Sequence, residues 1–151
     1  MQVSSLMSSP AQTCRGNTQL GQAAKQMAAG NCGCLPVVDD RGHLIGLITD
    51  RDIAATVADR HQSAWQLTVR EAMTRQVVSC APDDHIDDAL AAFSRLGVRR
   101  LPVVDRAGHV SGLLSIDDLV LHAGKGGLSE GAVFNTLRSV CSAETGRAVE
   151  R

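Results

Sequence analysis

The chain has 151 residues, of which 44% are hydrophobic and 21% charged, as in an ordinary globular protein of about one domain. Its 15 Lys and Arg residues against 16 Asp and Glu give a formal charge of −1, and 2% of the residues are aromatic, so we expect no binding of nucleic acid. No apolar run approaches the roughly 18 residues of a membrane helix, and no basic segment precedes an apolar one at the N-terminus, so we expect a cytoplasmic protein without membrane contact.

The first half of the chain predicts the order strand, helix, strand, strand, helix. Apolar residues at three- and four-residue spacing predict an amphipathic helix that ends at Gly30. Two short apolar runs around a polar turn predict a hairpin. The opening strand has a poorer composition, because Gln12 interrupts it. We expect these elements at residues 11–14, 20–29, 35–38, 44–48 and 50–58, followed by a linker at 59–66.

The second half predicts the same order with clearer patterns. Pro82, Asp83 and Asp84 supply an N-cap signal for an amphipathic helix, which Gly97 ends. Ser115 begins the last helix of this half. We expect a helical turn at 69–73, strands at 77–80, 101–104 and 109–114, and helices at 86–96 and 115–121.

The pattern changes after Ala123. The glycine-rich residues 124–127 predict a flexible joint, residues 128–141 predict one more helix, and residues 142–151 are expected to be frayed or disordered. The predicted organisation is a first motif at 1–66, which includes the linker, a second motif at 67–122, and the joint, helix and tail at 123–151.

The two halves repeat one another at an offset of 66 residues. They share the pentapeptide LPVVD, at 35–39 and at 101–105, and ten of the twenty positions between 35–54 and 101–120 are identical. A repeat without insertion indicates two copies of one supersecondary unit, each leaving apolar surface for the other to cover. We therefore expect an α/β (α+β) fold of two pseudo-symmetric units packed sheet to sheet, with a cleft between them.

The candidate site lies where each hairpin meets the helix that follows it. Both copies fit the pattern G-φ-φ-[ST]-x-x-D, in which φ is apolar, at residues 46–52 and 112–118. A hydroxyl at a helix N-terminus, beside free backbone N–H groups, suits a phosphate. An Asp one turn later can accept hydrogen bonds from two ribose hydroxyls. The glycine lets another chain segment or a flat base approach the strand closely.

A capping box is the alternative explanation of each motif. Ser or Thr followed three residues later by an acid caps helices in many proteins that bind no ligand. One such motif would favour a cap alone. Two at matching repeat positions, both after an apolar strand, favour a ligand site, and one hydroxyl can serve both roles.

This twofold pattern resembles a tandem pair of CBS motifs, the regulatory module often called a Bateman domain, over about residues 3–122. The resemblance implies small three-stranded sheets with two helices each, packed together, and pairs that commonly dimerise, so we expect a homodimer. It also implies an adenosyl ligand in the clefts between the motifs. AMP, ADP or ATP is expected first, and NAD or S-adenosylmethionine is the alternative.

The resemblance assigns roles by motif position. Asp52 and Asp118 resemble ribose-binding carboxylates, and Thr49 and Ser115 resemble hydroxyls that contact phosphate or ribose. Residues before and within the strands would flank the base, and nearby arginines would bind phosphate oxygens. The predicted site residues are Leu35, Pro36, Thr49, Asp50, Arg51, Asp52, Val78, Cys80, Arg99, Arg100, Leu101, Pro102, Ser115 and Asp118.

The two copies differ at the basic positions, so we expect clefts of unequal affinity. Arg99 and Arg100 correspond to Gly33 and Cys34 of the first copy. Because the two arginines alternate across the start of a strand, at least one is expected to point to solvent.

The five cysteines do not have the spacing of a disulfide framework. Cys32 and Cys34 lack His or Cys partners at ligand spacing, so no metal site is expected and the thiols are interpreted as small structural residues. A redox pair of Cys14 with Cys32 or Cys34 is the alternative. His43 and His109 each follow a turn glycine and are interpreted as surface residues that stabilise a hairpin end.

The sequence therefore predicts a stand-alone regulatory protein that senses an adenine nucleotide and signals to an effector protein by a change of conformation. No catalytic motif is present, so we predict no enzyme. The helix predicted at 128–141 is a candidate for the effector contact. A ligand-free structural or interaction module and a thiol-based redox-responsive protein remain alternatives, and slow nucleotide hydrolysis is a minor third.

Overall fold

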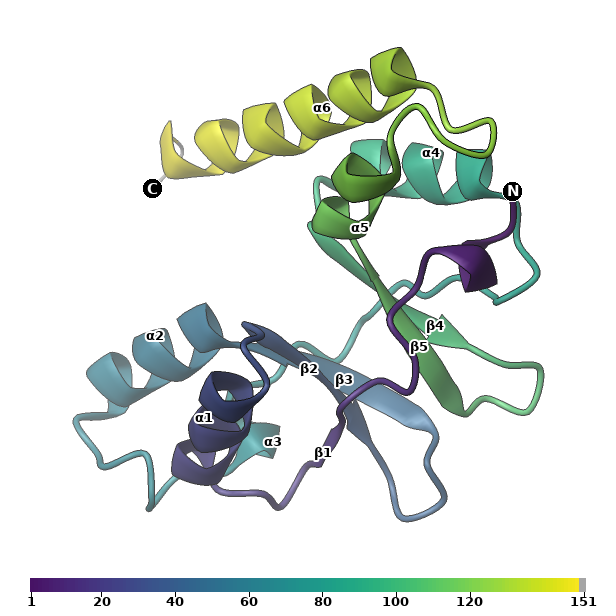
Figure 1. The fold of residues 1–151 in the computed structure, drawn as a ribbon. Helices are drawn as coiled ribbons and strands as arrows, with labels where there is room; N and C mark the ends of the chain where they lie inside the picture. The colour runs from purple at the N-terminus through teal and green to yellow at the C-terminus, as the bar shows by residue number, and fades with distance from the viewer. Residues whose placement is uncertain (150–151) are drawn as a thin grey trace. The chain divides into compact units, whose positions relative to one another are not determined.

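The computed structural model describes residues 1–149 and divides the chain into two compact units (Figure 1). We call Pro10–Val77 with Arg106–Val110 the first-repeat unit. The second-repeat unit consists of Met1–Ser9, Val78–Asp105 and the chain from Ser111 onward. The first-repeat unit has the β-α-β-β-α order of the sequence repeat, and the second-repeat unit has the same order with an isolated bridge in place of the opening strand and an additional C-terminal helix, which confirms the predicted fold class.

The first-repeat unit is built on a three-stranded sheet. Strand β1 (Cys14–Arg15) runs parallel to β2 (Cys34–Val38), and β2 runs antiparallel to β3 (Leu44–Thr49). Its core contains the buried residues Leu20, Leu35 and Ile48. The helices of this unit are α1 (Leu20–Ala29), α2 (Asp50–Arg60) and α3 (Val69–Ala72).

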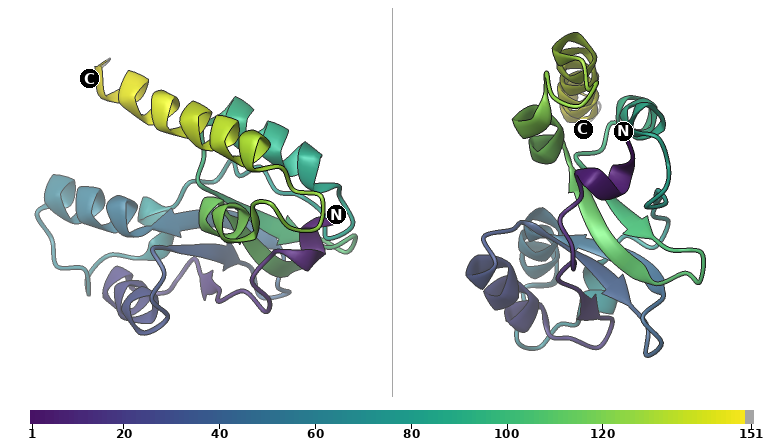
Figure 2. Two further views of the ribbon diagram at one scale, coloured as in Figure 1. Left: turned by 45° about the horizontal axis from the view of Figure 1, so that its top comes forward. Right: turned by 45° about the vertical axis from the view of Figure 1, so that its right-hand side comes forward.

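The second-repeat unit has a two-stranded sheet and a larger helical part. Its core is centred on Phe93, Leu101 and Leu119, all of which are inaccessible to solvent or nearly so. Helix α6 lies alongside α4 in both views of Figure 2 and also contacts α5. The elements are the 3-10 helix η1 (Val3–Ser5), α4 (Ile86–Leu96), β4 (Arg100–Val104), β5 (Val110–Ser115), α5 (Ile116–His122) and α6 (Glu130–Val149).

The segment that opens each sequence repeat pairs with the hairpin of the other repeat. Ser8 exchanges two backbone hydrogen bonds of 2.9 and 3.0 Å with Leu113, and Thr74 exchanges two of 2.9 Å with Leu47. These pairs are equivalent, since both of their members differ by the repeat offset. Residues 1–9 therefore complete the second-repeat unit, and residues up to Val77 complete the first.

The motif glycines admit these exchanged segments. A Cβ atom on Gly46 would lie 2.9 Å from the carbonyl oxygen of Thr74, and one on Gly112 would lie 2.9 Å from that of Ser8. Real Cβ atoms do not approach a carbonyl oxygen so closely. The prediction that each glycine lets a chain segment approach is confirmed.

The opening strands reverse the expectation from composition. The polar first copy forms the two-residue strand β1, whereas the β-prone residues 77–80 form only an isolated parallel bridge between Cys80 and Val103. Val78 remains 45% exposed, so it gains little from packing on a sheet. Strand formation here depends on burial against neighbours rather than on side-chain type.

The N-cap of α4 is His85 rather than the predicted residues 82–84. Its Nδ1 accepts a hydrogen bond of 3.3 Å from the N–H of Asp87. Asp84 instead accepts a bond of 2.7 Å from the N–H of Ala81 and closes the turn before the helix. The predicted helix bounds and the left-handed Gly97 at the C-cap, with φ of 62°, are confirmed.

Helix α6 continues past the predicted end at Cys141 to Val149. The expectation of fraying is therefore wrong for residues 142–149, while residues 150 and 151 lie outside the described residues. Packing of α6 along α4 extends the helix, and Glu144 is held 3.5 Å from Arg99. Among the residues the structure describes, none of the helices has the length and apolar content that a membrane span requires.

Candidate functional site

The candidate site in the first-repeat unit is the first turn of α2. Thr49 is its N-cap, and its Oγ1 accepts a hydrogen bond of 3.2 Å from the N–H of Asp52. Asp52 Oδ2 in turn accepts a bond of 2.9 Å from the N–H of Thr49. The two residues thus form a complete capping box, as the alternative explanation of the motif requires.

The second-repeat unit repeats this geometry at the first turn of α5. Ser115 Oγ accepts a bond of 3.1 Å from the N–H of Asp118. Asp118 Oδ2 accepts bonds of 2.8 Å from the N–H and 2.7 Å from the hydroxyl of Ser115. The Ser115 hydroxyl is therefore fixed in direction as a donor to Asp118.

The capping boxes occupy only one oxygen of each aspartate. Within residues 1–149, no protein group donates a hydrogen bond to Oδ1 of Asp52 or Asp118. Both side chains are partly accessible to solvent. Each carboxylate therefore has an oxygen that can accept hydrogen bonds from another molecule.

The first turn of α2 does not offer free amides to a phosphate. The N–H of Asp50 donates to the Gly33 carbonyl at 3.0 Å, and the N–H of Arg51 donates to Asp50 Oδ1 at 2.9 Å. With the amide of Asp52 bound to Thr49, all three amides have protein acceptors. The expectation of free N–H groups is therefore wrong for the first copy.

One repeat position lies directly above each helix start. The Gly33 carbonyl accepts the N–H of Asp50, and the Arg99 carbonyl accepts the N–H of Ile116, both at 3.0 Å. In the first copy the Asp50 carboxylate covers Gly33, since a Cβ there would lie 2.9 Å from Asp50 Oδ2. In the second copy this position is Arg99, whose guanidinium pairs with Glu144 of α6, and the helix begins at the apolar, buried Ile116. Both first turns contain two acidic residues, so the two helix starts differ at this one position, which is Gly33 beside a carboxylate in the first copy and Arg99 in the second.

The predicted arginines lie at different depths. Arg99 is exposed and forms an ion pair of 3.5 Å with Glu144 of α6, whereas Arg100, at the start of β4, is partly buried. Arg51 is exposed on α2. The expectation that Arg99 or Arg100 points to solvent is thus confirmed for Arg99.

The remaining predicted residues form strands or lie beside them. Cys80 is partly buried, with its Sγ 3.9 Å from the carbonyl oxygen of Pro102. Val78 is exposed and belongs to no strand. Leu35, Pro36, Leu101 and Pro102 are buried in β2 and β4, so they support the sheets.

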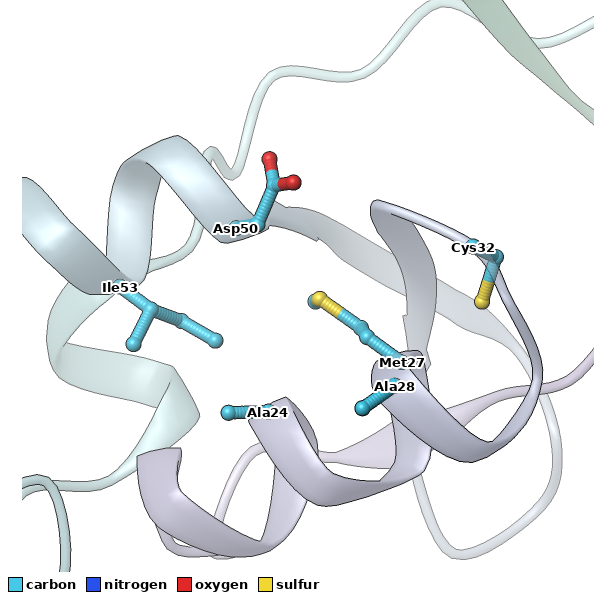
Figure 3. A pocket seen from close by; sticks show the side chains of 6 residues that line it. All are labelled: Ala24, Met27, Ala28, Cys32, Asp50 and Ile53. Atoms are coloured by element: carbon cyan, nitrogen blue, oxygen red, sulfur yellow. The ribbon is translucent and has the colours of Figure 1, made fainter.

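A hollow of about 250 Å³ lies between α1 and α2 in the first-repeat unit (Figure 3). Of the predicted site residues, only Asp50 lines it, so the hollow is separate from the capping box of Thr49 and Asp52. The sequence analysis did not predict this hollow. The available signal was a difference in size between equivalent positions, since Ala24 of α1 corresponds to Leu90 of α4. The lining residues are Ala24, Met27, Ala28, Cys32, Asp50 and Ile53. We call this feature the α1–α2 hollow.

Among the described residues the five cysteines form no disulfide, and two of them have raised pKa values. Burial raises the pKa of Cys14 to about 11, and burial together with the charge of Asp84 raises the pKa of Cys80 to about 11. Both are therefore neutral and weakly nucleophilic at pH 7. Within residues 1–149, no group of three His, Cys, Asp or Glu side chains could hold a metal ion.

The two predicted hairpin-end histidines stack on one another in the first-repeat unit. The ring centroids of His43 and His109 are 4.9 Å apart, with planes 13° from parallel. Asp39 lies 3.4 Å from Nδ1 of His43. The backbone N–H of His43, and then that of Arg41, hydrogen-bond to Asp39 and lower the pKa of its carboxyl. These contacts order the hairpin ends.

Comparison with known proteins identifies both repeats. The family model described as CBS domain matches residues 3–59 and 69–124. The CBS domain-containing protein YhcV of Bacillus subtilis is 32% identical over 120 residues, which are 80% of this chain and 84% of YhcV. L-aspartate semialdehyde sulfurtransferase of Methanocaldococcus jannaschii is 32% identical over 117 residues, but this chain spans only 22% of its length.

Solved structures of CBS-domain proteins are similar to this chain. The CBS domain pair of MJ0100, in complex with 5′-methylthioadenosine and S-adenosyl-L-methionine, has a TM-score of 0.73 at 31% identity and covers 80% of this chain and 94% of that one. The CBS domain protein TA0289 of Thermoplasma acidophilum has a TM-score of 0.77 at 28% identity, covering 92% of this chain and 75% of that one.

Proposed function

Because this chain belongs to the CBS-domain family, as a CBS pair with an added C-terminal helix, we propose that it is a regulatory protein that binds an adenosyl ligand and signals by a change of conformation. AMP, ADP or ATP is the first candidate ligand, and S-adenosylmethionine or NAD is the second. We assign no catalysis to the chain. We further propose that it acts in the cytoplasm as a homodimer and passes its signal to an effector protein.

The unused Oδ1 atoms of Asp52 and Asp118 are the observation that carries this proposal. A ribose offers two neighbouring hydroxyls, which a carboxylate oxygen can accept without disturbing the capping box. The related CBS pair of MJ0100 was solved in complex with 5′-methylthioadenosine and S-adenosyl-L-methionine. Thr49 and Ser115, at the same helix starts, position the two carboxylates through the hydrogen bonds of the caps.

The residues beside the two helix starts, Arg99 in the second copy and Asp50 in the first, predict which copy binds a phosphate. Arg99 offers a planar cation to phosphate oxygens. The equivalent place in the first copy carries the Asp50 carboxylate, which repels a phosphate. We therefore propose that the second-repeat unit binds the nucleotide phosphate, and that the first-repeat unit favours an adenosyl ligand without a negative group at this position.

A thermal-shift panel tests the proposal on the full chain. AMP, ATP, NAD, 5′-methylthioadenosine and S-adenosylmethionine are added at increasing concentrations, with guanosine monophosphate as the base control. A ligand at about 100 times its Kd stabilises the folded protein by about 2.7 kcal/mol, which raises the melting temperature measurably. Unchanged melting with every adenosyl compound would reject the sensor and favour the ligand-free interaction module.

A further inference from the structure

The helical face formed by α4 and α5 in the second repeat is packed against α6, whereas the equivalent face of α1 and α2 in the first repeat contains the α1–α2 hollow. In the second-repeat unit, α6 packs on α4 and α5, and its Val133 and Val140 belong to one buried cluster with Leu90, Phe93 and Leu119. The equivalent residues of the first repeat, Ala24, Met27 and Ile53, line the α1–α2 hollow, where Met27 and Ile53 are 3% and 8% exposed without a helix equivalent to α6. The fold thus shows, in its own second half, that a helix can occupy this face.

The walls of the α1–α2 hollow explain why it stays open. Ala24 stands where the second repeat has Leu90, and Asp50 stands where it has Ile116. Smaller side chains leave space, and the carboxylate at the rim keeps this part of the wall hydrated. At about 250 Å³ the hollow is below the roughly 300–1,000 Å³ of small-molecule pockets, so it suits one large side chain better than a nucleotide.

We propose that the α1–α2 hollow receives the outer face of α6 from a second copy of this chain. The inference rests on the homodimer of the proposed function and names the surface that forms it. In a twofold-symmetric dimer the same contact occurs twice, so each protomer contributes one hollow and one α6.

The outer face of α6 presents a large aromatic side chain and a cation, which complement the apolar wall and the carboxylate of the hollow. Phe134 is 61% exposed, although its neighbour Val133 is buried against the core. Arg138 lies one turn further along the same face and is exposed. Insertion of the Phe134 ring places an aromatic face against the Met27 thioether, a favourable contact.

Charge complementarity favours this occupant over an unrelated helix. Within residues 1–149, neither Asp50 nor Arg138 forms an ion pair. Asp50 lies at the rim of the hollow that receives Phe134, and Arg138 follows Phe134 by four residues. The partner's Arg138 can therefore pair with Asp50 when the ring is seated.

Charge reversal measured by sedimentation velocity tests this interface. Asp50→Arg and Arg138→Asp should each weaken dimerisation at least about tenfold, because each places like charges opposite one another. Mixing the two variants should restore the dimer. In the mixed dimer one contact is the native pair and the other is the reversed pair, so both are attractive.

Matched control variants distinguish loss of the proposed interface from a general effect of changing the surface charge. Asp59→Arg changes the charge of α2 on its opposite face, and Arg95→Asp does so on an exposed position of α4, so both should leave the dimer intact. Phe134→Gln alters an exposed residue and should give a folded monomer, with folding checked by circular dichroism. Melting shifts with the nucleotide panel are recorded for every variant.

The outcomes distinguish this inference from the proposed function. A wild-type dimer that survives Phe134→Gln and both charge reversals would overturn the interface but leave the homodimer and the ligand site standing. A monomeric wild type would overturn the homodimer and this inference together. Failure of the mixed variants to associate would reject the pairing of Asp50 with Arg138.

Discussion

The first turns of α2 and α5 share one hydrogen-bonded frame but differ in the residue that accepts the first helical amide, Gly33 in one and Arg99 in the other. In both, an N-cap hydroxyl and an aspartate form a capping box, and the first helical amide donates to a carbonyl 3.0 Å away. Gly33 lies beside the Asp50 carboxylate at the first helix start, whereas Arg99 at the second pairs with Glu144. The two repeats thus keep one hydrogen-bonded frame and differ in the side chains around it.

The largest expected effect comes from removing either carboxylate. Asp118→Ala and Asp52→Ala should each lower ligand affinity at their own site about a hundredfold, because hydrogen bonds to a charged group contribute about 1.5–3 kcal/mol each. Each should also cost about 0.5–2 kcal/mol of folding stability through the lost cap. Isothermal titration calorimetry measures the affinities.

The capping box of α3 supplies the control for that loss of stability. Glu71 accepts a bond of 2.8 Å from the N–H of Thr68, and neither residue is a predicted site residue. Glu71→Ala should therefore lower stability without changing affinity. If both aspartate variants bind like wild type, the carboxylates are caps and nothing more.

A smaller effect, on folding stability, should follow from replacing the motif glycines Gly46 and Gly112 by alanine. Gly46→Ala and Gly112→Ala place a Cβ against a backbone carbonyl, so each should destabilise the protein by about 1–3 kcal/mol in urea denaturation. Equal losses would show that both exchanged segments are packed alike. Gly131→Ala is the control, since its nearest atom lies at 3.6 Å in the first turn of α6, and it should be neutral or stabilising.

The smallest expected effect concerns the difference in charge. Arg99→Ala should lower the affinity for AMP about fivefold relative to the affinity for adenosine. The effect is small because Arg99 is partly exposed and water screens its interactions. Adding salt should likewise reduce the preference of the wild-type protein for AMP over adenosine. An unchanged ratio of AMP to adenosine affinity would remove Arg99 from the phosphate site.

Local patterns predicted the parts of the fold that local physics determines. The spacing of apolar residues gave the bounds of α1 and α4, and Gly97 gave the end of α4. The paired G-φ-φ-[ST]-x-x-D motifs indicated the two capping boxes, because a cap depends on residues three positions apart. The motif glycines also predicted a close chain segment at each hairpin.

Contacts between distant segments could not be predicted in the same way. Nothing near Ser8 in sequence indicates that it pairs with Leu113, and nothing near Glu144 indicates Arg99 as its partner. The continuation of α6 to Val149 and the α1–α2 hollow likewise depend on tertiary packing. His85 became the cap of α4 because Asp84 had already been used by the preceding turn.

The exchange of opening segments bears on how the protein is made. The ribosome must have synthesised residues through Val77, and the hairpin tip at Arg106–Val110, before the first-repeat unit has all its parts. Met1–Ser9 must meanwhile wait for strands that are synthesised about a hundred residues later. Neither motif is complete as a contiguous translation product, so we expect the two to reach their native state late and together, at the slower rate of chains rich in long-range contacts.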